Sequence, residues 1–199
     1  VLRGVPDISD VHTFLEILRG LGAKAEFSRG TITIQTEKIT SHEPAKEGVK
    51  QMRASILLLG PMLARAGKLK MFFPGGCVLG KRSVHAHTHA LHSLGATVEE
   101  NEEGIEARAE KLKGAKVIMT EASVTATENA LMAAVLAEGR TEIHWAAMEP
   151  HVQDLCRFLN KMGAKIEGIG TPTLVVEGVK KLHGAEHTVT PDYLEVGTL

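Results

Sequence analysis

A short glycine-rich loop, residues 74–83 (PGGCVLGKRS), combines the residue types in this 199-residue chain that could do chemistry. Its three glycines permit positive φ and let backbone N–H groups approach a ligand closely. Ser83 is suited to cap a following helix, whose positive end would favour an anion. Cationic neighbours, here Lys81 and Arg82, and a helix N-terminus are conditions that lower the pKa of a thiol. The loop therefore predicts an anion site with a reactive cysteine, Cys77, beside it.

Two other interpretations of this loop remain open from spacing alone. The stretch from Gly75 to Lys81 matches the first seven positions of a nucleotide-binding P-loop. The next residue should be Ser or Thr to hold magnesium, but it is Arg82, which argues against an ATPase. The other interpretation is a glycine-rich surface turn with an ordinary thiol, because a lone cysteine is a weak signal.

The bulk composition excludes several classes of function. Hydrophobic residues make up 43% and charged residues 24%, as in an ordinary soluble domain. The formal net charge of -1 gives no reason to expect nucleic acid or an anionic membrane as a partner. No apolar run approaches the roughly 20 residues that span a bilayer, and the first residues lack the basic region and apolar stretch that would predict a signal peptide. Cys77 and Cys156 form no CxxC pair, so the sequence predicts a reducing, cytoplasmic setting.

An internal repeat indicates which elements position the loop. Similar stretches end at the Gly-Ala pairs that begin at Gly22, Gly95 and Gly163, about 70 residues apart. Each stretch is typical of an amphipathic helix, a glycine just past its C-terminus, and a strand. A glycine-marked turn and a second strand follow each one, at residues 31–35, 104–108 and 174–177.

Two further helices, residues 53–66 and 124–138, are apolar or small on most faces, which predicts burial. Pro61 should bend the first of them. The repeat is then strand–helix–strand–helix–strand–strand. We predict an α/β fold of three such repeats, approximately residues 1–45, 46–117 and 118–190, with sheets outside and helices inside. The first repeat lacks its buried helix, so we expect a fragment; a naturally shorter first repeat is the alternative.

The motifs also carry a family resemblance over essentially the whole chain. They are PGGC-x-x-G-x-R at residues 74–82, MRASI at 52–56, SVTAT at 123–127, AAMEP at 146–150 and EVGT at 195–198. In this combination and order they resemble the UDP-N-acetylglucosamine 1-carboxyvinyltransferases. The resemblance implies one domain of a two-domain enolpyruvyl transferase with an inside-out α/β barrel, or prism. The shikimate-pathway enolpyruvyl transferases share that fold but lack the PGGC loop.

The resemblance implies a reaction and a set of residues. The family transfers the enolpyruvyl group of phosphoenolpyruvate to the 3-hydroxyl of UDP-N-acetylglucosamine for peptidoglycan synthesis, without a cofactor or metal. Cys77 matches the proton donor, which fosfomycin modifies. Arg53 and Arg82 match positions that contact anionic groups, for which the planar guanidinium is suited. The remaining matches are nucleotide-sugar contacts: Ser83, Val84, His85 and Ala86 in one segment, and Glu121, Ala122, Ser123 and Val124 in another.

Three departures from the family pattern put the acceptor in doubt. The family usually has Pro, Asp and Lys where this chain has Ser83, His85 and Glu121. The alternatives are a paralogue that uses another hydroxyl acceptor, or a truncated, non-catalytic nucleotide-sugar-binding domain. The family's active site lies between two domains, and the second domain is absent from this chain. We therefore expect these 199 residues alone to be catalytically inactive.

Five further side chains have types or positions that allow other roles. His85, His89 and His92 have the i, i+4, i+7 spacing that could hold zinc or nickel. No cysteine or carboxylate pair nearby completes such a site, so a histidine-rich polar face is the favoured interpretation, without a metal. Cys156 is expected to be a small core residue, and Trp145 is expected to pack rather than to form a stacking platform.

Overall fold

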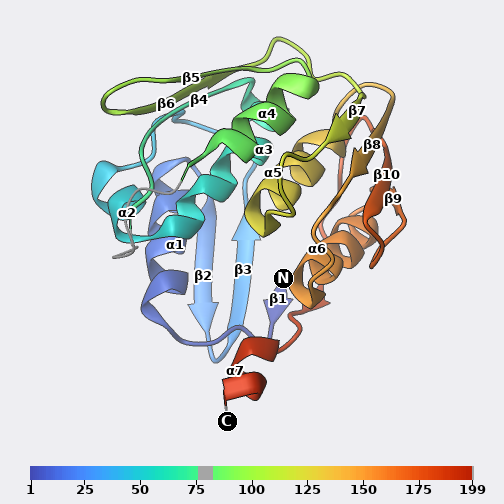
Figure 1. The fold of residues 1–199 in the computed structure, drawn as a ribbon. Helices are drawn as coiled ribbons and strands as arrows, with labels where there is room; N and C mark the ends of the chain where they lie inside the picture. The colour runs from blue at the N-terminus through green and yellow to red at the C-terminus, as the bar shows by residue number, and fades with distance from the viewer. Residues whose placement is uncertain (76–82, 199) are drawn as a thin grey trace.

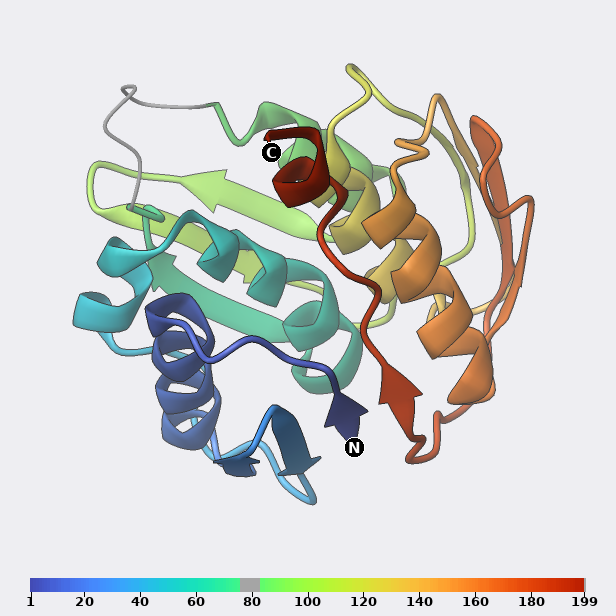
Figure 2. The ribbon, with the colours of Figure 1, turned by 90° about the horizontal axis from the view of Figure 1, so that it is seen from below.

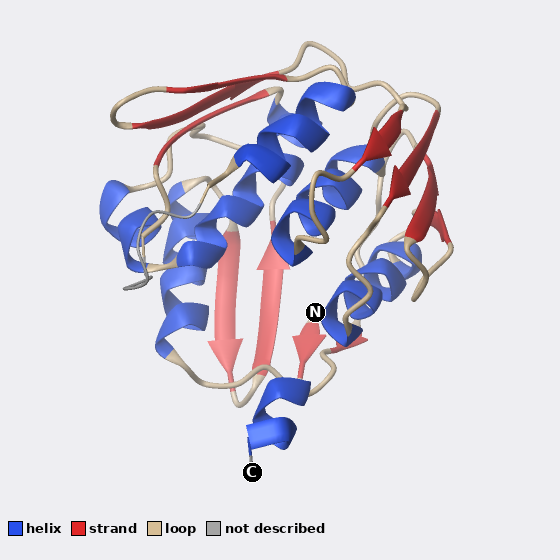
Figure 3. Ribbon diagram, in the orientation of Figure 1, coloured by secondary structure: helices blue, strands red, loops and turns tan. Residues whose placement is uncertain are grey.

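The computed structural model describes residues 1–75 and 83–198. Three β-sheets enclose a group of helices, with strands at the periphery and helices inside (Figures 1 and 3). The larger core contains Leu59, Leu91 and Leu131, one from each of three helices. This arrangement confirms the predicted inside-out α/β fold.

The three sheets have related strand orders. The first runs β11 (His187–Thr188), β1 (Leu2–Arg3), β3 (Thr31–Gln35) and β2 (Lys24–Ser28). The second runs β4 (Lys68–Phe72), β6 (Gly104–Arg108) and β5 (Thr97–Glu100). The third runs β7 (Lys116–Ile118), β8 (Arg140–His144), β10 (Thr173–Glu177) and β9 (Lys165–Glu167).

Two of the predicted helices differ from their expected spans in the structure, which contains eight helical segments in the described residues. They are α1 (Ser9–Gly20), α2 (Lys46–Gln51), the 3₁₀ helix η1 (Arg53–Leu58), α3 (Leu59–Ala66), α4 (His85–Ser93), α5 (Val124–Ala134), α6 (Pro150–Lys161) and α7 (Tyr193–Thr198). The helix predicted at residues 53–66 changes from 3₁₀ to α geometry just before Pro61, which lies in the first turn of α3 where its missing N–H is tolerated. Helix α5 ends four residues earlier than residue 138, the predicted end.

The third repeat shows the predicted unit in full, as β7, α5, β8, α6, β9 and β10. In the first sheet β11 pairs with β1 in parallel, as β7 pairs with β8, although β11 lies near the other end of the chain (Figure 2). The landmark glycines Gly22, Gly95 and Gly163 have φ of 107°, 88° and 96°, so they are the left-handed residues expected just past a helix.

The two inner helices α3 and α5 cross at very short range. A Cβ on Gly60 would lie 2.3 Å from the backbone oxygen of Asn129. Asn129 is fully buried, and its Oδ1 accepts a hydrogen bond from Gly60 N–H at 2.7 Å. Its Nδ2 donates to Ile56 O at 3.0 Å and to His87 Nδ1 at 2.9 Å. One amide therefore ties η1, α3, α4 and α5 together.

Gly60→Ala should destabilise the protein because its methyl group would press against the backbone of α5. We expect the free energy of unfolding, measured by urea denaturation, to fall by about 2 kcal/mol or more. Gly20→Ala is the matched control, because nothing lies within 4 Å of the added Cβ. That change should be neutral or stabilise α1 by up to about 1 kcal/mol. Equal stability of the two variants would contradict the close crossing.

Candidate active site

Three helical segments begin close together, and the predicted substrate contacts lie at these beginnings. Arg53 opens η1, His85 opens α4, and Val124 opens α5. Arg53 Nη2 donates to Ser83 O at 3.3 Å. Thr125 Oγ1 lies 3.3 Å from His87 Nε2, which joins the first turns of α5 and α4. Two α-helix N-termini and a guanidinium therefore share one region, which favours an anion.

Two serines shape these helix starts. Ser83 was expected to cap the helix, but the N-cap of α4 is Val84; Ser83, one residue earlier, accepts a hydrogen bond from His85 N–H at 3.0 Å through its Oγ. Ser123 is the N-cap of α5, and its Oγ accepts from Ala126 N–H at 3.4 Å. Thr127 Oγ1 donates to Ser123 O at 2.8 Å and accepts from Ala147 N–H at 3.1 Å. The loop that precedes α6 is thereby fixed to the same end of α5.

The structure distinguishes side chains that can reach a ligand from those that cannot. Ser83 and His85 are exposed, whereas Val84 and Ala86 are buried, so only the backbone of the latter two can contact a substrate. In the second segment the side chains of Glu121 and Ala122 are exposed, and those of Ser123 and Val124 are half-buried. Cys77 and Arg82 lie outside the described residues, so their roles stay predictions.

His87 is part of this region, although the sequence analysis did not select it. Its side chain is buried, and Nδ1 must accept the hydrogen bond from the Asn129 amide, which leaves the ring proton on Nε2 toward Thr125. Burial, and then the positive charge of Arg53, lower the pKa of His87 to about 4. The ring is therefore neutral at physiological pH and positions the first turn of α5.

A buried carboxyl lies one turn further along α5. Burial, and then the neighbouring carboxylate of Glu149, raise the pKa of Glu128 to about 7. Glu149 Oε2 is buried and has no hydrogen-bond partner in the part of the chain that the structure describes. Ionisation of Glu128 is therefore disfavoured at this position. Hydrophobic periodicity does not single out Glu128, because α5 is buried on nearly all sides.

The histidine face of α4 makes structural contacts. His89 Nε2 lies 3.1 Å from Ile118 O, and His92 Nε2 accepts from Val98 N–H at 3.0 Å. His85 and His89 stack with ring centroids 6.1 Å apart. Among residues 1–75 and 83–198, no group of three or more metal-ligating side chains could hold an ion. These contacts favour the interpretation of a histidine-rich polar face.

Two expectations about single residues have opposite outcomes. Cys156 is fully buried, and burial raises the pKa of its thiol to about 11, so its place in the core is confirmed. Trp145 was expected to pack, and that expectation is wrong: it is 55% exposed. Its φ is 59°, so its backbone is in the left-handed region and no longer continues the extended conformation of β8.

In the described residues, no helix combines the length and apolarity that crossing a membrane needs.

The shifts at His87 and Glu128 predict opposing effects of pH on stability. The pKa of His87 falls from 6.5 to about 4 on folding, so its stabilising contribution is present above pH 6.5 and is lost toward pH 4. The pKa of Glu128 rises from 4.5 to about 7, so its contribution is present below pH 4.5 and is lost as the pH rises through 7. In the range between, acidification costs stability at His87 and adds it at Glu128.

Glu128→Gln removes the titrating carboxyl of Glu128 and leaves His87 in place. We expect the variant to lose stability more steeply than wild type between pH 7 and pH 4.5, and to be more stable than wild type above pH 7. Urea unfolding at a series of pH values measures both effects. An unchanged pH profile in the variant would show that Glu128 is not a buried, proton-binding carboxyl.

Known proteins match this chain along its whole length. The EPSP synthase (3-phosphoshikimate 1-carboxyvinyltransferase) family matches residues 1–199. A UDP-N-acetylglucosamine 1-carboxyvinyltransferase 2 from Carboxydothermus hydrogenoformans is 50% identical over 197 residues, which are 99% of this chain and 47% of the relative. A UDP-N-acetylglucosamine 1-carboxyvinyltransferase from Dichelobacter nodosus is 48% identical over all of this chain and 48% of its own length. The chain thus spans about half the length of these curated relatives.

Solved structures share the fold. The enolpyruvyl transferase NikO from Streptomyces tendae superposes with a TM-score of 0.84 at 24% identity, over 99% of this chain and 47% of NikO. An EPSP synthase from Acinetobacter baumannii gives 0.74 at 23% identity, over 98% of this chain and 45% of that one. These similarities confirm the α/β fold, and the match over residues 1–199 with the relatives of 48–50% identity shows that the chain belongs to the EPSP synthase (3-phosphoshikimate 1-carboxyvinyltransferase) family.

Proposed function

We propose that the full-length protein transfers the enolpyruvyl group of phosphoenolpyruvate to the 3-hydroxyl of UDP-N-acetylglucosamine, in the synthesis of peptidoglycan precursors. The observation that carries the proposal is the meeting of Arg53, the Ser83–Ala86 segment and the Glu121–Val124 segment at one end of the helices. The names of the relatives that are 48–50% identical over the chain support it. In this proposal the chain is the part that carries the cysteine loop.

The proposed chemistry is an addition followed by an elimination. Cys77 delivers a proton to the methylene carbon of phosphoenolpyruvate while the sugar hydroxyl gives its proton to a base of the second domain and adds to the neighbouring carbon. A proton of the new methyl group then returns to the Cys77 thiolate, the double bond re-forms, and inorganic phosphate departs with the proton that the base had taken. Arg53 and Arg82 hold anionic groups through paired N–H donors, and the starts of α4 and α5 add positive potential. The second domain of the full-length protein would close the site.

One observation favours a second candidate, a transferase of the same chemistry with another hydroxyl acceptor. Glu121 is exposed beside the start of α5, and a carboxylate there repels a nucleotide diphosphate. His85 is also exposed in the segment proposed to bind uridine. An acceptor with fewer phosphate charges would suit these two residues better. The non-catalytic binding domain remains the outcome if the full-length protein shows no turnover with any acceptor.

Arg53→Gln tests the proposed function in the full-length protein. We expect phosphate release from phosphoenolpyruvate and UDP-N-acetylglucosamine to fall about 100-fold or more in kcat/KM, because a charged hydrogen bond to an anionic group is lost. Arg157→Gln is the matched control, since Arg157 is exposed on α6 and contacts Gln153. Its activity should stay within about twofold of wild type.

The same assay also distinguishes the two candidate functions, transfer to UDP-N-acetylglucosamine and transfer to another hydroxyl acceptor. Turnover with another hydroxyl acceptor but not with UDP-N-acetylglucosamine would favour the paralogue, and turnover insensitive to Arg53→Gln would contradict the proposed site.

We also propose that a third buried helix completes the first repeat in the full-length protein. The second and third sheets each cover an inner helix, α3 and α5, and the first sheet has no equivalent among the described residues. A hollow of about 730 Å³ lies in that region instead. Its apolar lining comes from the first sheet, from the C-terminal part of α3, from the turn after α5, and from the C-terminal part of α6; it includes Leu2, Ile32, Ile34, Ala64, Leu136, Phe158 and Met162. A small core around Leu15 and Ile32 stays separate from the main core on the same side.

Neighbouring residues of β3 provide the test, because they point to opposite faces of the strand. Ile34 lines the hollow and is 39% exposed, and Thr33 points outward. In the full-length protein, Ile34→Asp should lower the free energy of unfolding by about 3 kcal/mol, because the helix would bury the carboxylate. Thr33→Asp should change it by less than about 1 kcal/mol. Similar small effects of both changes would show that no helix occupies the hollow.

A further inference from the structure

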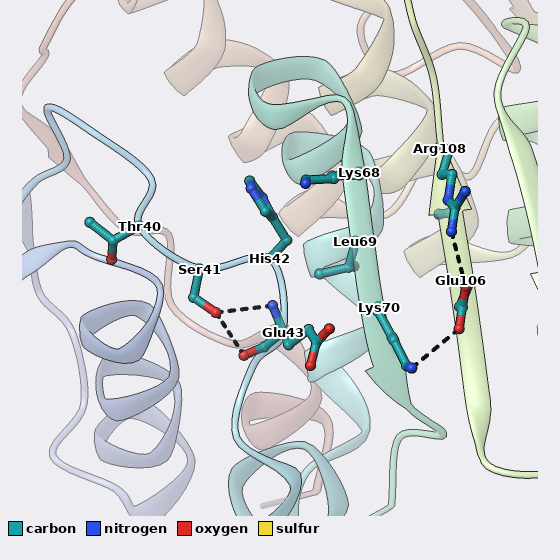
Figure 4. A pocket seen from close by; sticks show the side chains of 10 residues that line it. Thr40, Ser41, His42, Glu43, Lys68, Leu69, Lys70, Glu106 and Arg108 are labelled. Carbon is teal, nitrogen blue, oxygen red and sulfur yellow. Dashed lines mark hydrogen bonds and ion pairs between the residues drawn. The ribbon is translucent and has the colours of Figure 1, made fainter.

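The second repeat departs from the other two where its first strand should lie. In the first and third sheets, β11 and β7 fill this position and pair with β1 and β8. Beside β4 the position is taken by the irregular segment Thr40–Glu43, joined to β4 by a hydrogen bond from Lys70 N–H to His42 O at 2.9 Å. A hollow of about 660 Å³ opens between this segment, β4 and β6 (Figure 4).

The outer face of this sheet carries cations that are only partly neutralised. Lys68 lies directly opposite Arg108, and Lys70 lies opposite Glu106. Glu106 is shared, at 3.4 Å from Lys70 Nζ and 3.5 Å from Arg108 Nη2. In the described part of the chain Lys68 makes no ion pair, and like charges directly opposite one another destabilise a sheet. Glu106 therefore offsets the charges of Lys70 and Arg108 only in part, and Lys68 is offset by no carboxylate in the described part of the chain.

A third group faces the same hollow from the other side. His42 Nδ1 is buried and has no hydrogen-bond partner in residues 1–75 and 83–198. The His42 ring and the Lys68 ammonium point toward each other across the hollow, while Glu43 lies toward its Lys70 end (Figure 4). A buried polar atom without a partner carries a desolvation cost that a bound ligand can remove. The Lys68 ammonium can donate to an acceptor in the hollow, and His42 Nδ1, which is closed off from solvent in this structure, can do so if its ring rotates.

We propose that this hollow binds a small dianion, such as the phosphate group of a soluble metabolite, through Lys68, Arg108 and His42. A phosphate accepts hydrogen bonds from several donors at once, and guanidinium presents a fork of donors to it. Its two negative charges would neutralise the facing cations and relieve their repulsion. The site lies at the beginning of β4, and the cysteine loop follows the other end of that strand, so it is distinct from the proposed transferase site.

Inorganic phosphate is the probe, titrated into the ¹⁵N-labelled full-length protein at constant ionic strength. We expect saturable shifts of the Leu69 and Ala107 amides, with a midpoint of about 1 mM. Phosphate is also a product of the proposed reaction, so these local amides distinguish the two sites. Lys68→Gln and Arg108→Gln should each weaken the binding about 10-fold, and Lys24→Gln, an exposed lysine on β2, should not change it. Absent or unsaturable shifts at Leu69 and Ala107, or the same midpoint in Lys68→Gln, would overturn the proposal.

Lys68→Glu provides a variant in which loss of binding cannot be due to unfolding. The new carboxylate would lie opposite Arg108 and form a favourable cross-strand pair, so the melting temperature should be equal or higher. Binding of phosphate at Leu69 and Ala107 should be abolished at the same time. A variant that melts no lower and still binds phosphate with the wild-type midpoint would show that Lys68 is not part of an anion site.

Discussion

The short crossing of α3 and α5 is the constraint on which the rest of the structure depends. It requires a glycine at position 60, because a Cβ there would lie 2.3 Å from Asn129 O. It also places the Asn129 amide where it can bond Gly60, Ile56 and His87 together. Because His87 then reaches Thr125, the starts of α4 and α5 are held side by side. The candidate site is thus positioned by a contact in the core.

Local patterns predicted the elements better than their ends. The strands at residues 31–35 and 104–108 were predicted with the bounds that the structure has, because glycines mark their turns. The break between η1 and α3 and the early end of α5 depend on packing between the two inner helices, which periodicity does not report. Trp145 was misjudged because hydrophobicity alone does not show that a residue lies in a left-handed turn on the surface.

In the candidate site, too, local sequence patterns predicted some residues, and long-range packing determined others. Motifs located Arg53, Ser83 and Ser123, since residues at helix starts belong to short contiguous segments. His87 and Glu128 were missed, because their shifted pKa values come first from burial between packed helices and then from the charges of Arg53 and Glu149, which are distant in sequence. No composition rule reports such contacts. The shifted pKa values of His87 and Glu128 can therefore be recognised only from the packed three-dimensional structure.

The helix starts around Arg53 are the proposed nucleotide-sugar site. Mapping of amide chemical shifts in the ¹⁵N-labelled full-length protein, with UDP-N-acetylglucosamine added, tests this proposal most directly. We expect the largest shifts within this part of the protein at the starts of α4 and α5, at His85, Val124 and Thr125. Shifts confined to other surfaces, or no saturable shift at these amides, would contradict it.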